Sequence, residues 1–314
     1  DLTNRCNIRC SGCYYYEGEK QFASENKDPQ TWRRLMQAEK KRGITYVVLA
    51  GAEPALVPEL CEVCYQEMPL GAIATNGLIF LPESIQYRIH ISVWGTDETS
   101  LKIRKAKNML HKQLENYHRD SRAVFVYTFT RPNITQAYQV AEILAGDGAR
   151  MTFNMFSAPV GYTGDLGHTD DSLKECRQTM SDLLETYPDT ILFSKYNAVV
   201  HTQTVGLHEL FSCPYPRMNP STAVGLGRTF RQYRTDLNWN RSAACCVPDT
   251  DCNDCRHYAS GSAVVTARMF RHAKNPDTFK AWLDYVDTYL AVWVMGYEKG
   301  PNLSDALIAP PGQG

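Results

Sequence analysis

The chain has 314 residues, enough for one large α/β domain with an appendage or for two domains. Its net charge of −1 provides no overall basic field, so we do not expect nucleic acid as a partner. No run of about 20 apolar residues is present, so we expect no membrane span. The eleven cysteines are clustered, which fits a reducing cytosol and metal clusters and predicts a cytoplasmic protein. No signal peptide is visible, but the chain begins at Asp1 rather than Met, which leaves targeting open.

The first motif is a C-x3-C-x2-C array formed by Cys6, Cys10 and Cys13, directly after Leu2 and Thr3. Three thiolates on one short loop can hold three corners of a [4Fe–4S] cluster and leave the fourth iron open for an exogenous ligand. Structural zinc usually takes four protein ligands, and no fourth Cys or His lies nearby in the sequence. A disulfide framework does not suit three cysteines in a chain of this size. The array therefore predicts an iron–sulfur cluster that takes part in chemistry.

Strand-like and helix-like segments alternate over residues 31–156. Buried strands are expected at 44–49, 72–75, 88–94, 123–129 and 150–156. Helices are expected at 31–42, 57–68, 97–118 and 135–145. Repeated β–α units imply a parallel sheet with crossover helices, and the segment before Cys6 brings the number of units to about six. This predicts an α/β fold, an open (β/α)6 partial barrel, with ligands at the carboxyl ends of its strands.

Three short motifs lie on or directly after consecutive predicted strands: Gly51-Ala52-Glu53-Pro54, then Thr75-Asn76-Gly77, then Ser92. Taken singly, they would be a tight turn, a turn signal and a buried hydroxyl bonded to backbone. Small residues also let the backbone approach a ligand closely. In this order, together with the cysteine array, they resemble the radical S-adenosylmethionine (SAM) superfamily. Ala52 replaces the second glycine of that family's G-G-E-P segment.

The resemblance implies a [4Fe–4S] cluster on Cys6, Cys10 and Cys13, with SAM as the second cofactor. It also implies a set of SAM-binding residues, namely Gly51, Ala52, Glu53, Pro54, Thr75, Asn76, Ser92 and Tyr15. Many members carry an aromatic residue beside adenine just before the third cysteine, where this chain has Gly12. Adenine would then be held by Tyr14, Tyr15 or the strand end at residues 127–130.

Three further cysteines are expected to be ordinary core thiols. Cys61 and Cys64 share one face of a predicted helix, and Cys176 lies in a charged helix predicted over residues 172–186. None of the three is expected to be a ligand.

The carboxyl-terminal third contains a second group of cysteines, namely Cys213, Cys245, Cys246, Cys252 and Cys255. The Cys252-x2-Cys255 pair with distant cysteines before it is a metal-ligand grouping, and one of Cys245 and Cys246 would complete a set of four. The arrangement resembles the SPASM and twitch extensions of radical SAM enzymes, which hold auxiliary [4Fe–4S] clusters. The number of cysteines suits a single twitch-like cluster. A zinc knuckle is the alternative, and His257 could replace a cysteine in either site.

The expected domains are a radical SAM core over residues 1–160, extending as far as about 205, a twitch-like region over 206–300, and a tail over 301–314. The loop at 157–171, rich in Gly and Pro, is a candidate seam between the first two. Residues 276–295 predict a docking helix whose apolar stripe comprises Phe279, Trp282, Leu283, Val286, Leu290 and Trp293.

By the same resemblance, the chain reductively cleaves SAM to a 5′-deoxyadenosyl radical, which abstracts hydrogen from a small natural product or a peptide. The outcome would be oxidation, crosslinking or rearrangement, with a flavodoxin- or ferredoxin-type protein as reductant. One alternative is radical addition to an unsaturated substrate, as in adenosylhopane synthase; another is a non-enzymatic iron–sulfur carrier or zinc scaffold. No general acid or base is assigned, and the candidates for lining the cavity are Tyr14, Tyr15, Tyr16, His90, Tyr127, Asn154 and Arg217.

Overall fold

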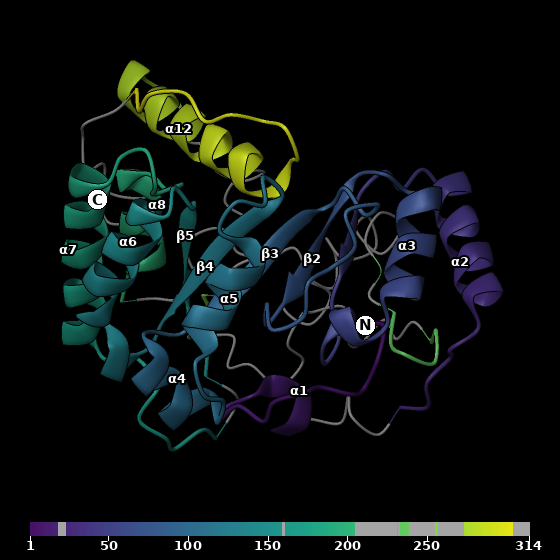
Figure 1. Ribbon diagram of the computed structural model, residues 1–314. Helices are drawn as coiled ribbons and strands as arrows, with labels where there is room; N and C mark the ends of the chain where they lie inside the picture. Colours follow the sequence, from purple (N-terminus) through teal and green to yellow (C-terminus); the bar gives the residue numbers. More distant parts are fainter. Residues whose placement is uncertain are drawn as a thin grey trace.

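The computed structural model describes residues 1–17, 23–158, 161–204, 231, 233–238, 255–256 and 273–303. At its centre is a five-stranded parallel sheet with the order β1-β2-β3-β4-β5 (Figure 1). The strands are β1 (Val47–Leu49), β2 (Gly71–Thr75), β3 (Arg88–Val93), β4 (Ala123–Phe129) and β5 (Met151–Met155). Each strand pairs with the next one in the chain, so all carboxyl ends meet at one edge. The predicted α/β fold, a partial barrel, is confirmed.

Helices cover one face of this sheet. The longer ones are α2 (Pro29–Lys41), α3 (Pro58–Glu67), α6 (Gln136–Gly146) and α7 (Asp170–Thr186). The remaining short helices are α1 (Tyr14–Glu17), η2 (Pro54–Leu56), η3 (Arg131–Asn133) and α8 (Lys195–His201). Their starts follow ordinary capping chemistry; for example, the Asp28 carboxylate accepts hydrogen bonds from the first turn of α2. The apolar faces of these helices and alternate strand residues such as Ile73, Ile91 and Phe125 form one core.

The helix predicted over residues 97–118 is two helices, α4 (Asp97–Arg104) and α5 (Met109–Tyr117). The chain turns between them because Lys105 and Asn108 adopt left-handed backbone conformations, with φ of 57° and 50°. The Asp97 carboxylate accepts a hydrogen bond from Leu110 N at 2.7 Å and so joins the two helix starts. As a result Arg104, which ends α4, and Gln113 of α5 both reach the same strand end, described below.

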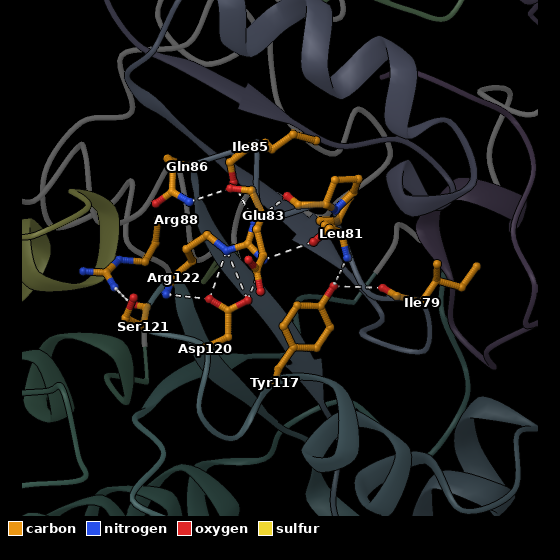
Figure 2. Close-up of polar contacts among 11 residues, drawn as sticks. Ile79, Leu81, Glu83, Ile85, Gln86, Arg88, Tyr117, Asp120, Ser121 and Arg122 are labelled. Atoms are coloured by element: carbon orange, nitrogen blue, oxygen red, sulfur yellow. Dashed lines mark hydrogen bonds and ion pairs between the residues drawn. The ribbon is translucent and has the colours of Figure 1, made fainter.

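The connection from β2 to β3 has no crossover helix, and a buried arginine orders it instead. Arg122 is 2% exposed and donates hydrogen bonds to the carbonyls of Leu81, Pro82 and Ile85. Asp120 pairs with the same guanidinium, while the Tyr117 hydroxyl bonds Ile79 O and Leu81 N (Figure 2). These contacts satisfy backbone groups of Ile79, Leu81, Pro82 and Ile85, so the loop is ordered without helical structure.

Short extended segments flank both edges of the sheet. The segment before Cys6, predicted to be a strand, is not one, but Leu2 N donates to Ala50 O at 2.8 Å and Ala52 N donates to Thr3 O at 2.8 Å. At the other edge, residues 190–192 lie beside β5 through bonds between Met151 and its neighbours Thr190 and Leu192. The amino-terminal segment is thereby held next to the residues that follow β1.

The helix α12 (Pro276–Trp293) lies at the end of the sheet opposite α1 (Figure 1). Arg88 Nη2 donates to Ala291 O and Val294 O, both at 3.0 Å, and the Tyr46 hydroxyl donates to Trp293 O at 2.6 Å. These donors satisfy carbonyls that the end of a helix leaves unpaired. The predicted docking helix is present, and its last turn is fastened to the amino-terminal ends of the strands.

The buried face of α12 differs from the predicted stripe. Of the six stripe residues only Trp293 is buried, and Phe279 is 42% exposed. The buried side chains are instead Ala281, Asp284, Tyr285, Thr288, Ala291, Val292 and Trp293. The polar contacts of the last turn set the rotation of the helix, and small alanines allow close packing, so hydrophobic spacing alone selects the wrong face. Among the described residues, no helix combines the length and the apolar character needed to cross a lipid bilayer.

The contact of His90 with α12 predicts a pH-dependent stability. Its Nε2 lies 2.8 Å from Val292 O, and burial lowers the pKa of His90 to about 4. The unfolded chain binds a proton near pH 6.5, so between about pH 6.5 and pH 4 it holds more protons than the folded chain, and stability falls as pH falls. We expect His90 to contribute a loss of about 2 kcal/mol in unfolding free energy from about pH 7 to about pH 5. Denaturant titration at both pH values measures it.

His90→Gln is the matched variant for this measurement, because it keeps an N–H donor for Val292 O and does not titrate. Its unfolding free energy should fall less steeply with acid than that of the wild type. His168 and His201, whose pKa burial also lowers to about 4, supply the remaining slope. Equal slopes in variant and wild type would contradict the assignment.

Candidate active site

The loop of Cys6, Cys10 and Cys13 lies at the carboxyl ends of the strands, as predicted. The Nδ2 atom of Asn76, the residue after β2, lies 3.8 Å from Cys6 Sγ and donates to Asn7 Oδ1 at 2.6 Å. All three cysteines are half-buried. The cysteine motif and the second strand-end motif of the sequence are therefore in direct contact.

The loop rests on Asn4. Its Oδ1 accepts hydrogen bonds from the hydroxyls of Tyr15, at 2.5 Å, and Thr235, at 3.2 Å, and its carbonyl accepts one from Tyr16 at 3.0 Å. Tyr15 is 2% exposed. Its hydroxyl is thus engaged beneath the loop, and a contact of Tyr15 with SAM would be made by its ring.

Gly12, where many family members have an aromatic residue, has a left-handed backbone with φ of +67°. A Cβ atom there would lie 3.2 Å from Leu166 Cδ1 and from Phe156 Cζ, so the residue before Cys13 must be small and tolerant of this conformation. Phe156 follows β5 and packs edge-on against Trp94. Phe156, which sequence reasoning missed, therefore lies beside the loop, with Trp94 packed against it.

The strand end at residues 127–130 does not supply the aromatic surface predicted for adenine. Tyr127 is fully buried in the core against the helices, and its hydroxyl donates to Asn133 O at 2.7 Å. Thr130 is also fully buried. The prediction placed Tyr127 toward the ligand, but strand alternation directs its side chain to the helix-covered face.

Glu53 links the first two strand-end motifs. Its Oε1 accepts from the Thr75 hydroxyl at 2.7 Å and from Ala55 N at 2.9 Å, and its Oε2 accepts from Asn76 N at 2.8 Å. Burial raises the pKa of Glu53, and these three hydrogen bonds oppose part of that rise. The carboxylate thereby orients Asn76 toward the cysteine loop.

A second network joins Ser92 of β3 to Gln113 and Arg104. Ser92 O accepts from Gln113 Nε2 at 2.9 Å and also from Arg104 Nη1, while Ser92 Oγ accepts from Trp94 Nε1 at 3.1 Å. Arg104 is 5% exposed, and its Nε has no hydrogen-bond partner within the described ranges. A buried guanidinium with an unused donor is a site for an anion. Sequence reasoning missed Arg104, which resembles an ordinary charge at a helix end.

The face of the sheet opposite the helices is lined by small side chains near these networks. Ala74 and Ser92 point to this face, where Ala74 is exposed, whereas Ala72 lies at the other end of β2 and packs against α12. Farther along, Asn154 Nδ2 donates to Thr128 Oγ1 at 3.2 Å, and Asn154 Oδ1 has no partner in the described part of the chain. Of the residues predicted to line a cavity, Asn154 is available, whereas His90 is engaged with α12 and Arg217 lies outside the described residues.

The residues present fit a [4Fe–4S] cluster with SAM. The three thiols are half-buried on one short loop, small side chains leave room on the sheet, and Arg104 offers a desolvated cation. Within residues that the structure describes, no three His, Cys, Asp or Glu side chains converge closely enough to hold a single metal ion. A four-iron cluster does not require such convergence, because each thiolate binds a separate iron.

Burial distinguishes three other described cysteines from those of the amino-terminal loop. Cys61, Cys64 and Cys176 are fully buried, and burial raises the pKa of both Cys64 and Cys176 to about 12. They are core thiols, as predicted. Cys213, Cys245, Cys246 and Cys252 lie outside the described residues, as does His257.

Cys255 is half-buried, and the residue after it is anchored to the barrel. Arg256 N donates to Ser157 Oγ at 2.9 Å, and Arg256 Nη1 donates to His201 O at 3.3 Å. Ser157 lies just beyond β5, so Cys255 is held at the same edge of the sheet as the amino-terminal cysteine loop. The auxiliary cluster itself stays a prediction.

The comparison that decides the family is with the radical SAM superfamily model, which matches residues 1–148. This part of the chain belongs to the radical SAM superfamily. Similar proteins include the sporulation killing factor maturation protein SkfB of Bacillus subtilis (strain 168), 27% identical over 187 residues that cover 55% of this chain and 44% of the relative. Fe-coproporphyrin III synthase of Methanosarcina barkeri (strain Fusaro / DSM 804) is 23% identical over 199 residues, covering 59% and 50%. The chain spans about half the length of these curated relatives.

Among solved structures, the chain is similar in fold to histidine-tagged anSMEcpe with bound AdoMet, with a TM-score of 0.52 and 11% identity over 98% of this chain and 90% of that one. Streptococcus suis SuiB bound to S-adenosylmethionine gives a TM-score of 0.48 and 16% identity, covering 62% and 49%. The predicted cofactors, a [4Fe–4S] cluster and SAM, are those of the radical SAM superfamily.

We expect that adding one methyl group at Gly51 strongly lowers the stability of the protein. It has a φ of +143°, and a Cβ atom there would lie 2.9 Å from Leu2 N and 3.1 Å from Thr3 O. Gly51→Ala should therefore displace the segment that leads into the cysteine loop and cost about 3 kcal/mol of unfolding free energy. Denaturant titration gives the stability, and iron content after reconstitution reports the loop.

The matched control is Gly43→Ala. Gly43 also has a positive φ, +94°, but a Cβ atom there would meet nothing within 4 Å. Gly43→Ala should lose only about 1 kcal/mol of unfolding free energy, the cost of placing alanine in this backbone conformation, and should keep its iron. Similar losses in both variants would show that contact with Leu2 and Thr3 is unimportant.

Proposed function

We propose that this chain reductively cleaves SAM at a [4Fe–4S] cluster and uses the resulting radical to abstract hydrogen from a small natural product or a peptide. The observation that carries the proposal is the contact of Asn76 with Cys6 and Asn7, which brings the three-cysteine loop and the strand-end motifs into one site. A protein that merely carried electrons would need the three cysteines but would have no need of the strand-end motifs.

Cys6, Cys10 and Cys13 would hold the cluster, and SAM would lie along the strand ends. When bound, the cluster with one open iron supplies a coordination site for SAM and the electron that breaks its carbon–sulfur bond. Glu53 and Thr75 keep Asn76 in place, while the backbone of Gly51 and Ala52 lies beside the loop. The remaining proposed SAM contacts are Pro54, Ser92 and the ring of Tyr15.

Arg104 would bind the carboxylate of SAM. Its guanidinium is buried, retains an unused donor among the described residues and interacts electrostatically with Glu53. An anion placed there would gain charge-assisted hydrogen bonds at a site that is already desolvated. This interaction would also fix the orientation of the ligand before its bond is broken.

The names of the relatives and the polar side chains on the sheet face opposite the helices support the proposed substrate class. The relatives are named for maturing a sporulation killing factor and for making an iron coproporphyrin. Asn154 and Thr128 would offer hydrogen bonds to a polar group of the substrate. Oxidation, crosslinking or rearrangement would follow hydrogen abstraction.

The carboxyl-terminal cysteines would hold one auxiliary [4Fe–4S] cluster through Cys213, one of Cys245 and Cys246, Cys252 and Cys255. The anchoring of Arg256 beside Ser157 supports a position near the substrate side of the barrel. Because α7 and α8 contribute to the main core, the radical SAM core would extend to about residue 205, followed by the extension over 206–300 and the tail over 301–314.

The test is anaerobic reconstitution with iron and sulfide, reduction with dithionite, and chromatography of the products from SAM. Release of 5′-deoxyadenosine and methionine is expected. A covalent adenosyl product with an added alkene would instead indicate radical addition. Uptake of iron without SAM cleavage would indicate an electron carrier, and uptake of zinc by the second cysteine group would indicate a scaffold there.

A further inference from the structure

A short segment of the carboxyl-terminal region packs beneath the cysteine loop. It comprises residues 231 and 233–238, within the twitch-like region predicted over 206–300, and it lies beside the amino terminus (Figure 1). Thr235 of this segment is fully buried. Its carbonyl accepts a hydrogen bond from Asn26 N at 2.8 Å, and its hydroxyl lies 2.9 Å from Ser24 O and 3.2 Å from Asn4 Oδ1. Thr235 therefore joins the segment to Asn4, on which the loop rests.

Asn4 connects the two ends of the cysteine loop. It lies two residues before Cys6, at the start of the loop. The hydroxyls of Tyr15 and Tyr16, which follow Cys13, donate to its side-chain oxygen and to its carbonyl. Tyr16 N donates in turn to Cys13 O at 3.0 Å. Asn4 therefore helps to set the separation of the first and the third thiol.

The donors of Asn4 are fixed by the segment over residues 23–26. Asn4 N donates to Glu25 Oε1, and Asn4 Nδ2 donates to Ala23 O. Each polar atom of Asn4 thus has a partner, and Thr235 is a partner that lies 231 residues away in the sequence. Loss of the Thr235 hydroxyl would remove one of the two donors that meet Asn4 Oδ1 and would loosen its position.

The segment that carries Thr235 is itself held by α2. The Tyr233 hydroxyl donates to Glu39 Oε1 at 2.8 Å, and Arg231 Nη1 donates to the same oxygen at 3.1 Å. Glu39 is 6% exposed and belongs to α2, whose apolar face is part of the main core. Leu237 packs against this core as well. These contacts give Thr235 a defined position from which it can hold the loop.

We propose that Thr235 is a positioning residue for the cysteine loop and acts through Asn4. The inference rests on the proposed function and adds a residue of the carboxyl-terminal region to the site of the amino-terminal cluster. The loop must present three thiolates to three separate irons, so the position of the open iron depends on the shape of the loop. Misplacement of reacting groups by about 1 Å can lower a rate by about 100-fold. Thr235 is therefore expected to affect the rate of SAM cleavage through the loop.

The test variant is Thr235→Val, which removes the hydroxyl and keeps the shape of the side chain. Thr235→Ser keeps the hydroxyl. The matched control is Thr152→Val, because Thr152 is 1% exposed and its hydroxyl donates to Leu192 O at 2.8 Å. Each protein is reconstituted anaerobically, and 5′-deoxyadenosine release gives kcat and the KM for SAM. Electron paramagnetic resonance records how the spectrum of the reduced protein changes when SAM is added.

Thr235→Val should keep the iron content of the wild type, lower kcat by about tenfold and leave the KM for SAM within about threefold. The change that SAM causes in its resonance spectrum should differ from that of the wild type. Thr235→Ser should recover most of the rate. Thr152→Val should lose a similar amount of stability, since it loses the same kind of hydrogen bond, but should match the wild type in kcat and in spectrum.

Three results would each overturn the inference and leave the proposed function in place. They are a wild-type kcat in Thr235→Val, an equal fall of kcat in Thr152→Val, and a Thr235→Ser variant as slow as Thr235→Val. In all three cases the wild type still cleaves SAM. A wild type that assembles its cluster and does not cleave SAM would instead overturn the proposed function.

Discussion

Cys10→Ala is expected to abolish SAM cleavage and to remove about four irons per chain, the content of one cubane cluster. Cys10 lies between Cys6 and Cys13 on the half-buried loop, and a cluster with two thiolates and one missing corner would not be retained. If the auxiliary cluster is present, about four irons should remain in the variant. Iron and sulfide analysis and chromatography of 5′-deoxyadenosine measure the two effects.

Cys64→Ala is the matched control, with the same chemical change at a fully buried thiol. It should keep its iron and its SAM cleavage, and lose about 1 kcal/mol of stability because a small cavity is created. Unchanged iron content in Cys10→Ala would show that the amino-terminal array is not the cluster site.

Arg104→Met should weaken SAM binding by about 30-fold, because a hydrogen-bonded charge pair contributes about 2 kcal/mol. The fold should be unaffected, since Ser92 O keeps its hydrogen bond from Gln113 when Arg104 is removed. Removal of a buried cation that lacks a full set of partners can even raise the melting temperature of the ligand-free protein. Equilibrium dialysis of the reconstituted protein with SAM measures the affinity.

Two controls separate charge from packing at Arg104. Arg104→Lys keeps a positive charge without the planar fork and should recover part of the affinity. Arg119→Met removes an arginine just beyond α5, outside these networks, and should bind SAM like the wild type. Wild-type affinity in Arg104→Met would assign the SAM carboxylate to other groups.

The strand-end residues illustrate which site features can be predicted. Glu53, Thr75 and Asn76 can be predicted because they belong to motifs that follow predicted strands and resemble those of the radical SAM superfamily, and parallel strands end at one edge. Their contacts bear out this proximity, although the structure shows them holding one another and the cysteine loop. Arg104 and Phe156 have no comparable signal, because their roles depend on a helix end and a strand end that meet only in the folded chain.

The sequence alone determined the parallel α/β fold, the location of the cysteine loop and the core character of Cys61, Cys64 and Cys176. These features follow from local periodicity and from the order of motifs, both of which are visible in the sequence without any information on packing. Only the tertiary structure decided the break between α4 and α5, the buried face of α12 and the inward side of Tyr127. Each of these depends on contacts between segments that are apart in the sequence. The break between α4 and α5 combines left-handed residues with the hydrogen bond from Leu110 to Asp97, and the rotation of α12 is set by Arg88 and Tyr46, which bind its last carbonyls. Tyr127 faces inward because alternate side chains of its strand pack against the helical layer.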